Sequence, residues 1–430
     1  MKKYPPIDSK LFISNRNKFS RKLRKKSVAI FNSNDEMPRN GDMNFRFRQN
    51  SDLLYLSGID QEQSILVICP DAPLPQYREI LFLRQTNEHI AIWEGHKYTK
   101  EEARSASGID TVLWLEEFDS VINVLMNHSD NVYLNLNEND RFVTEVPYRE
   151  LRFSEKWKTL YPNHNYERSG PIMATLRAVK DKIEIELLQK ACNITRDAFI
   201  RVAEFTEPGV SEHEIEAEIT HEFLWQRANG HAYTPIVASG RNACVLHYND
   251  NNQICNDGDV ILMDFGAEYA NYSADLTRCI PVSGKFTRRQ KNVYNAVLRV
   301  MRGAMDMLTP GNTIEQYHKD VGSMMEEELR KLRLLKKRDI DKQDPANPAY
   351  KKYFMHGTSH FLGLDTHDIG DKYSPIKAGM VFTVEPGIYI LEENLGIRLE
   401  NDIVVGRKGY KDLMADIPLE ADEIEDLMNS

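Results

Sequence analysis

The chain has 430 residues, of which 41% are hydrophobic and 28% are charged. This is the composition of a globular protein with a large core, and it excludes long disorder and collagen-like repetition as descriptions of the whole chain. At roughly 150 residues per domain, the length indicates two or three domains. The 65 acidic residues exceed the 55 basic residues and give a formal net charge of −10, so nucleic acid is a poor default partner.

The sequence does not indicate a membrane or an export route. No stretch approaches the ~20 consecutive apolar residues that a membrane helix needs. The segment 2–26 is basic but lacks the apolar part of a cleaved signal, and it is typical of a solvated helix face or tail. The cysteines show no CxxC spacing and indicate reduced thiols in a cytoplasmic protein rather than a disulfide framework. They are Cys69, Cys192, Cys244, Cys255 and Cys279.

Residues 1–172 alternate short apolar runs with helical patterns, which predicts an α/β domain. The composition of the runs predicts strands at 64–70, 79–84, 89–93, 111–115 and 131–137 and helices at 99–108 and 116–128. A domain boundary is expected within 166–177. Just after it, Asp181 and Glu184 have the spacing of a capping box that begins an amphipathic helix.

Residues 173–430 contain an internal repeat. Near 207–211 and again near 309–313, a Pro-Gly pair stops one helix and a Ser or Thr can cap the next. Further on, the segments 258–266 and 379–387 each place an acidic residue six positions after one glycine and two before another. The matching order predicts a duplicated helix-helix-strand-strand unit. The second copy carries a Lys- and Arg-rich insertion at 326–353, which we expect to form a solvated helix and loop.

Each copy of the repeat places two acidic residues in otherwise apolar strands. In a hairpin with the right register, Asp264 lies opposite Asp275, and in the second hairpin Glu385 lies opposite Glu400. Stacking the copies about a pseudo-twofold axis would gather all four carboxylates. Four acids so close cannot all stay ionised unless cations neutralise them, so the pattern predicts two divalent metal ions. A solvated strand face is the alternative, and a one-residue slip would break either pairing.

Histidines cluster between the two hairpins. His356, His360 and His367 fall within twelve residues, which predicts one metal ligand and further catalytic donors. His247 is a fourth candidate, for which a core histidine is an equally good interpretation. The segment 356–360 lacks the glutamate of HExxH, which excludes a single-zinc protease of that type. Oxygen ligands with one imidazole suit harder ions such as Mn²⁺, and paired ions that share a water predict hydrolysis of an amide.

The ligand pattern resembles that of the pita-bread metallopeptidases, peptidase family M24. The residues 45–68 resemble the N-terminal domain of the aminopeptidase P branch, and the similarity covers nearly the whole chain. Methionine aminopeptidases lack that domain, and creatinase lacks the metal ligands. The resemblance implies an α/β N-terminal domain over 1–172. It implies an α+β pita-bread catalytic domain with an internal pseudo-twofold duplication over 173–430.

The resemblance also implies which residues hold the metal. Asp264 would chelate one ion, and Asp275 and Glu400 would bridge both ions. His360 and Glu385 would hold the other ion. Manganese is the preferred metal, with cobalt, iron or zinc as alternatives.

Further roles around the metal follow from the same resemblance. They fall on His247, His367, His356, Arg398, Tyr233, Tyr389 and Trp93. His247 and His367 would hydrogen-bond the substrate and the tetrahedral intermediate, while Arg398 would orient acidic ligands. Trp93 would reach the substrate pocket from a neighbouring subunit of a homodimer or homotetramer.

These expectations describe a metal-dependent aminopeptidase that hydrolyses the N-terminal Xaa-Pro bond of peptides. A water or hydroxide bridging the two ions would attack the scissile carbonyl. The expected partners are peptides with proline at the second position, without nucleic acid or membrane. Three alternatives stay open: a prolidase, which prefers dipeptides, a non-catalytic pita-bread module that binds peptides or proteins, and a structural calcium-binding protein.

Overall fold

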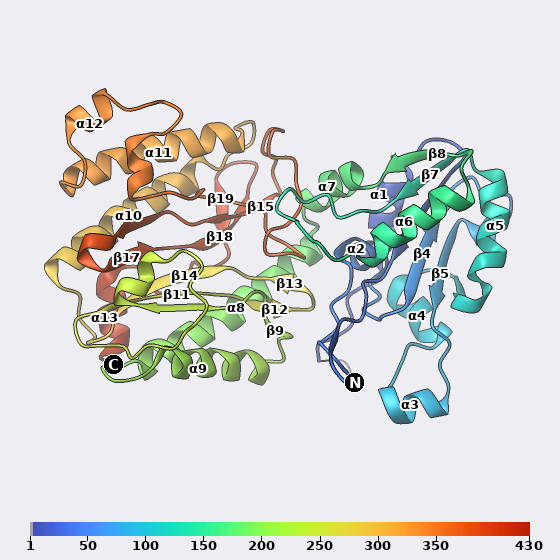
Figure 1. Ribbon diagram of the computed structural model, residues 1–430, viewed down its shortest axis with the longest axis horizontal. Helices are drawn as coiled ribbons and strands as arrows, with labels where there is room; N and C mark the ends of the chain where they lie inside the picture. The colour runs from blue at the N-terminus through green and yellow to red at the C-terminus, as the bar shows by residue number, and fades with distance from the viewer. Residues whose placement is uncertain (1–2) are drawn as a thin grey trace. The chain divides into compact units, whose positions relative to one another are not determined.

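The computed structural model describes residues 3–430 and divides into two compact units, Tyr4–Arg177 and Ala178–Ser430 (Figure 1). The division coincides with the end of helix α7 (Gly170–Ala178), so the predicted boundary after residue 172 falls inside that helix. Among the described residues, no helix is long and apolar enough to cross a membrane. The five cysteines are free, and four of them are buried.

The N-terminal unit is built on one six-stranded sheet in the order β6-β5-β4-β1-β7-β8. Strand β4 runs antiparallel to both of its neighbours, and the remaining pairs are parallel. The strands are β1 (Ser27–Asn32), β4 (Ser64–Ile68), β5 (Glu79–Leu83), β6 (Thr111–Trp114), β7 (Asn131–Leu134) and β8 (Asn165–Arg168). The central strands β1, β4 and β7 are buried along their whole length, as expected for strands covered on both faces.

Helices cover this sheet and complete its core. They are α1 (Lys10–Ser20), α2 (Ser51–Ser57), α3 (Glu88–Glu94), α4 (Lys100–Ser107), α5 (Phe118–His128) and α6 (Arg149–Leu160), with a small hairpin of β2 (Pro38–Asn40) and β3 (Met43–Asn44). The apolar face of α5 and Trp157 of α6 join one hydrophobic cluster with side chains of β1, β4, β5 and β7. The α/β domain predicted from the alternation is therefore confirmed.

Two local predictions in this unit need correction. Residues 89–93 form part of helix α3 instead of a strand: the side chain of Asn87 accepts a hydrogen bond from the N–H of Ile90, and no residue of the helix is buried. Strand β1 was not among the predicted strands, although it is buried along its whole length like β4 and β7, which lie in predicted runs. In the basic N-terminal segment, α1 has one solvated face and buries Arg16, which bonds Glu79. Lys2 lies outside the described residues.

The C-terminal unit repeats one order of elements twice. Helices α8 (Lys182–Phe205) and α9 (Glu212–Trp225) precede β11 (Val260–Phe265) and β14 (Leu276–Pro281), and then α10 (Arg288–Met307) and α11 (Ile314–Lys331) precede β15 (Val381–Val384) and β18 (Asn401–Val405). The predicted capping box at the start of α8 is present. The insertion begins only after α11 ends at Lys331, and residues 332–352, with α12 (Lys337–Asp341), are mostly exposed.

Shorter strands complete the sheets of this unit. They are β9 (Gly230–His231), β10 (Ile236–Ser239), β12 (Ala267–Tyr269), β13 (Tyr272–Ser273), β16 (Gly387–Ile390), β17 (Leu395–Arg398) and β19 (Tyr410–Asp412), followed by the last helix α13 (Ala421–Met428). One sheet has the order β10-β11-β14 and another the order β15-β18-β19. A bridge between Thr277 and Glu400 joins the strands of the first copy to those of the second.

The predicted register is wrong in the first hairpin and right in the second. Asp264 pairs with Thr277, two positions from the expected Asp275. In the second hairpin Val384 pairs with Asn401, and Gly387 pairs with Arg398. These pairs flank Glu385 and Glu400 and place the two acids opposite each other, as predicted.

A buried ion pair fixes the loop 363–368, which contains His367, the last residue of the histidine cluster. The Nζ of Lys180 lies 2.8 Å from the Oδ2 of Asp368, and both side chains are 1% exposed. The backbone of Gly363 packs so closely against them that a Cβ there would lie 2.2 Å from Asp368 Oδ2. The ion pair therefore connects residues 363–368 to the segment directly before α8.

We predict that Lys180→Met lowers the free energy of unfolding by about 3–5 kcal/mol, because it removes the buried positive charge 2.8 Å from the carboxylate of Asp368. The matched control is Lys319→Met, which breaks an exposed pair with Glu315 on α11 and should cost less than about 1 kcal/mol. Urea denaturation of both variants measures the difference. Similar losses in the two variants would contradict the importance of the buried pair.

Candidate metal centre

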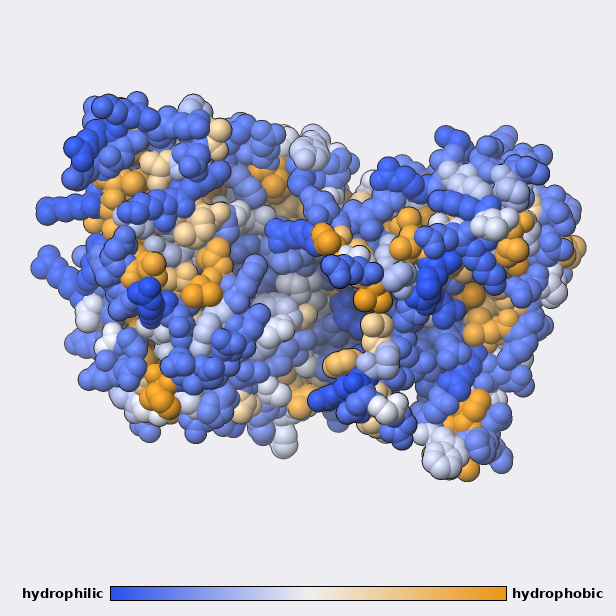
Figure 2. All heavy atoms as spheres, in the orientation of Figure 1, coloured by the Kyte–Doolittle hydropathy of each residue, from blue (hydrophilic) through white to orange (hydrophobic). Residues whose placement is uncertain are grey.

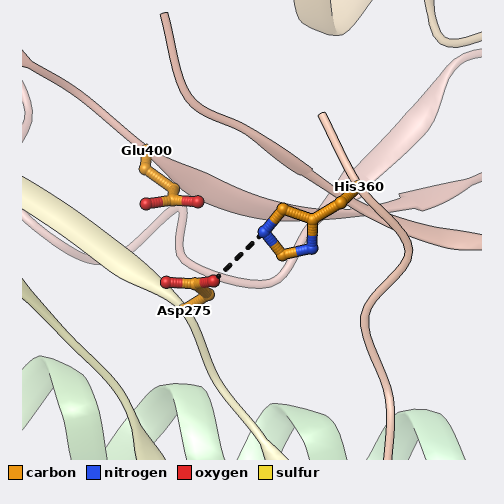
Figure 3. Close-up of side chains that lie close together, drawn as sticks. All are labelled: Asp275, His360 and Glu400. Carbon is orange, nitrogen blue, oxygen red and sulfur yellow. Dashed lines mark ion pairs between the residues drawn. The ribbon is translucent and has the colours of Figure 1, made fainter. Parts of the chain in front are cut away.

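Three side chains from separate segments converge in the C-terminal unit (Figure 3). They are Asp275 directly before β14, His360 in the coil before β15, and Glu400 directly before β18. Each offers a ligand atom, and these atoms all lie within 4.8 Å of one another. Asp275 and Glu400 are 5% and 1% exposed. The group joins one acid from each copy of the repeat and has the donor types that bind divalent metals.

The imidazole of His360 is oriented toward the carboxylates by its own backbone neighbour. Its Nδ1 lies 3.0 Å from the carbonyl oxygen of Phe361. A carbonyl can only accept, so Nδ1 carries the proton and Nε2 presents a lone pair. That Nε2 lies 3.4 Å from Asp275 Oδ2 and 3.6 Å from Glu385 Oε1. This is the arrangement of a metal-binding histidine held by a hydrogen bond on its other nitrogen.

Glu400 has one oxygen satisfied and one that is not. Its Oε2 accepts a hydrogen bond of 2.6 Å from the hydroxyl of Thr277. Its Oε1 is buried and has no hydrogen-bond partner among the described residues. An unpartnered buried carboxylate oxygen is costly, and a divalent cation would satisfy it.

The electrostatics of the cluster also favour a cation. Burial raises the pKa of Glu400 and of Asp275 well above the usual carboxyl range, and the neighbouring carboxylates raise both further. Burial raises the pKa of Glu385 to about 7, where His360 opposes the rise and Asp275 adds to it. These groups resist being ionised together, and a nearby positive ion lowers the cost of their charge. The donor set therefore fits the metal that the sequence predicts.

Asp264 is connected to the cluster through a tyrosine. The hydroxyl of Tyr233 lies 2.6 Å from Asp264 Oδ1 and 2.5 Å from Asp275 Oδ1. Burial and the two aspartates raise the pKa of Tyr233 far above its ordinary value, so it stays protonated. One hydroxyl proton cannot serve two carboxylates at once, so a second proton or a cation must hold them together. The other oxygen of Asp264, Oδ2, accepts a hydrogen bond of 2.5 Å from Nη2 of Arg398.

A hydrogen-bonded chain leads outward from Arg398. Its Nη1 donates to the hydroxyl of Tyr389 at 2.9 Å, and that hydroxyl lies 2.7 Å from Nε2 of His356. Because Nδ1 of His356 donates to the carbonyl of Gly357, its Nε2 accepts from Tyr389. Burial, and secondarily Arg398, lower the pKa of His356 to about 3. His356 is therefore a neutral acceptor near neutral pH.

The remaining predicted residues divide between the two units. His367 is exposed, and its ring lies edge-on to His360 with 4.3 Å between centroids. His247 is exposed in the loop after the short helix η3 (Gly240–Cys244), near enough that its charge would lower the pKa of His356.

Trp93 belongs to the N-terminal unit. It is 77% exposed on α3, beside the 80% exposed Ile92. Figure 2 shows hydrophobic atoms at that helix on an otherwise mostly hydrophilic face. Its expected contact with the site of a neighbouring subunit stays a prediction.

Sequence reasoning missed residues that contact the predicted ligands, among them Thr277 and Asp402. The hydroxyl of Thr277 donates to Glu400 and accepts from Nε of Arg398 at 3.2 Å. The Oδ2 of Asp402 accepts from the N–H of Asp275 at 3.1 Å, and Asp402 is fully buried. Asp402 interrupts the apolar run of β18 and so carries the same signal that revealed Glu400. Thr277 carries none, because threonine is common in strands.

Comparisons with known proteins agree with this geometry. Residues 186–407 match the model of metallopeptidase family M24, and residues 12–133 match that of the aminopeptidase P N-terminal domain. The chain is 34% identical to a Xaa-Pro aminopeptidase of Haemophilus influenzae over 97% of each chain.

Solved structures give the same result. The structure of aminopeptidase PepP of Pseudomonas aeruginosa matches with a TM-score of 0.89 at 30% identity, covering 100% of this chain and 99% of that one. A zinc-substituted Escherichia coli aminopeptidase P in complex with product matches with a TM-score of 0.88 at 32% identity, covering 99% of each chain.

Removal of metal gives a direct test of the cluster. At a metal concentration of about a hundred times Kd, binding should stabilise the wild-type protein by about 2.7 kcal/mol. We predict that Asp275→Asn loses most of this gain. Without metal, the variant should be at least as stable as the wild type, because one buried like charge is gone. Thermal unfolding with and without Mn²⁺ measures both effects, and an equal metal-induced shift in the variant would contradict the assignment.

The same measurement has an expected pH dependence. A carboxyl group whose folded pKa is raised, such as Glu385, stabilises the fold below its ordinary pKa and loses that contribution as the pH rises through about 7. The metal-free protein should therefore lose stability between about pH 5 and about pH 8, and saturating metal should reduce this loss.

Proposed function

Because the chain belongs to metallopeptidase family M24 and carries the aminopeptidase P N-terminal domain, we infer that it is an Xaa-Pro aminopeptidase. Such an enzyme hydrolyses the bond between the N-terminal residue of a peptide and a proline at the second position. The observation that carries this proposal is the buried cluster of Asp275, His360 and Glu400, with Asp264 and Glu385 beside it. Glu385 Oε1 lies 3.6 Å from His360 Nε2, and the hydroxyl of Tyr233 joins Asp264 to Asp275.

We propose two divalent ions at this cluster, with Mn²⁺ preferred because oxygen ligands predominate. Asp264 would hold one ion, His360 and Glu385 would hold the other, and Asp275 and Glu400 would serve both. When bound, the ions supply Lewis acidity for a water and for the scissile carbonyl. Glu400 Oε1, which is buried and has no hydrogen-bond partner among the described residues, supports this assignment, as does His360 Nε2, which lies 3.4 Å from Asp275 Oδ2.

The protein's own groups orient these ligands and the substrate. Arg398 fixes Asp264, and it also holds Tyr389, which donates to His356. His247 and His367 are exposed on loops near the cluster, where each can donate a hydrogen bond to the carbonyl oxygen as negative charge develops on it. His356 stays neutral and serves as an acceptor.

Specificity for proline follows from the chemistry of the bond. The nitrogen of an Xaa-Pro bond carries no hydrogen, so a peptidase that holds its substrate through that N–H handles it poorly. The free N-terminal ammonium of a substrate carries positive charge, and the acidic cluster attracts it. This attraction restricts cleavage to the first bond of the chain. We propose that the protein acts in the cytoplasm, where its five free thiols would stay reduced.

Trp93 is proposed to contribute to the substrate pocket of a second copy in a homodimer or homotetramer. Two exposed apolar side chains in sequence, Ile92 and Trp93, support a contact of this kind. A large exposed aromatic beside an aliphatic side chain is typical of interface anchors.

We predict that His360→Ala and Glu385→Ala each lower kcat/KM on an Xaa-Pro-Xaa tripeptide roughly a thousandfold, because each removes a ligand of the metal that activates the reaction. Lys319→Met, on the exposed face of α11, serves as the control and should retain full activity. Assays use equal metal supplementation, and circular dichroism checks that each variant is folded. Full activity of either ligand variant would refute the site.

A comparison of substrates separates this function from its alternatives. The aminopeptidase should cleave an Xaa-Pro-Xaa tripeptide at least about ten times faster than the Xaa-Pro dipeptide, about 1.4 kcal/mol in the barrier. The reverse preference would identify a prolidase. Binding of metal and peptide without hydrolysis of either substrate would identify a non-catalytic module. Product analysis by mass spectrometry distinguishes the three outcomes.

A further inference from the structure

Glu212, the first residue of α9, is a buried carboxylate to which the functional assignment gives no role. It is 0% exposed, and no Lys or Arg of residues 3–430 forms an ion pair with it. Its Oε1 accepts from Ser239 N–H at 2.8 Å, Ser239 Oγ at 2.7 Å and Asn242 Nδ2 at 3.4 Å, and its Oε2 accepts from Tyr248 Oη at 2.8 Å and Gln253 N–H at 3.0 Å. Its charge is stabilised by these five donors of one loop.

The donors lie along the loop that carries His247. Ser239 ends strand β10, Tyr248 directly follows His247, and Gln253 is near the end of the loop. Glu212 therefore bonds to both ends of the 239–253 loop and to Tyr248, the residue next to His247. A backbone hydrogen bond adds to this attachment: the N–H of Glu212 donates to the carbonyl of Gln253.

A second acid on the same helix strengthens this attachment. Glu216 lies one turn after Glu212, and its Oε2 accepts from Asn251 Nδ2 at 2.8 Å. Asn251 has a φ of 43°, in the left-handed region, and its side chain also accepts from the N–H of Val237. Two acids on one face of α9 thus hold an irregular segment in one conformation.

The loop also packs against β17, the strand that carries Arg398. A Cβ on Gly396 of β17 would lie 2.1 Å from the carbonyl oxygen of Ala243 in η3. Gly396 is two residues before Arg398, which binds Asp264. The loop therefore contacts both α9 and the strand that carries Arg398.

We propose that Glu212 is a positioning residue for the hydrolytic reaction, which sets the place of His247 through the 239–253 loop. This rests on the proposed function, in which His247 donates to the substrate carbonyl as it becomes an oxyanion. A carboxylate suits the task because it only accepts, and all five of its partners are donors. An amide at the same place would direct N–H groups at other donors and release part of the loop.

The test is Glu212→Gln, measured alone and combined with His247→Ala. We expect Glu212→Gln to lower kcat on an Xaa-Pro-Xaa tripeptide about tenfold to a hundredfold with KM changed less than about twofold, because the lost contact is made in the transition state. In the His247→Ala background the same substitution should change kcat less than about threefold, since coupled residues are not additive. Glu218→Gln, on the same helix and paired with Arg201 at the surface, is the matched control.

Several results would overturn the proposal. Equal losses in both backgrounds would mean that Glu212 supports only the fold, and unchanged kcat would remove its role. Full activity of His247→Ala would refute the role of that histidine in the proposed function, which is a separate failure. If Glu212→Gln does not fold, Tyr248→Phe removes the phenolic hydroxyl beside His247, which donates to Glu212 and accepts from the N–H of Asn252. It should show the same dependence on His247 with a smaller loss.

Discussion

The mutual repulsion of buried carboxylates is the constraint on which the C-terminal unit depends. Asp275 and Glu400 come from different copies of the repeat, and a bridge between Thr277 and Glu400 brings their strands together. Apolar strands supply the burial, and burial makes each negative charge expensive. The two halves of the unit can therefore meet in this way only if protons or metal ions compensate the acids. Metal binding and the packing of the two copies are consequently one equilibrium.

The residues around the cluster already hydrogen-bond several of its carboxylate oxygens, which limits where a proton or a cation can bind. Arg398, Tyr233 and Thr277 each occupy one oxygen of an acidic ligand, and Asp402 fixes the backbone of Asp275. These contacts leave a small set of lone pairs available to bind a cation, including one on Glu400 Oε1. A set with fixed positions favours ions of matching charge and coordination over a mobile proton. The site is thus prepared before the ion arrives.

The sequence predicts this cluster because a charge in an apolar strand is a local anomaly that needs an explanation. The same reasoning misplaced the first hairpin by two residues. Its turn uses Ala270 and Asn271, both with positive φ of 52° and 67°, whereas alanine is disfavoured in that region and gives no turn signal. In the second hairpin Asn394 takes the left-handed position that asparagine tolerates, and the predicted register is correct. Local turn chemistry decided which prediction succeeded.

Residues that hold the loops are less visible to the sequence than the residues of the acidic cluster. Glu212 follows a serine at the start of a helix, where an acid is favoured by the helix dipole alone, so its pattern needs no further cause. Lys180 precedes the capping box of α8 and looks like a solvated charge beside a helix end. Both are buried because distant segments close over them, and only the tertiary structure shows this. An acid in a strand reveals its burial through its neighbours in sequence, whereas an acid at a helix end reveals it only through its neighbours in space. The positioning residues of a site are therefore the part of its chemistry that has to be read from the fold.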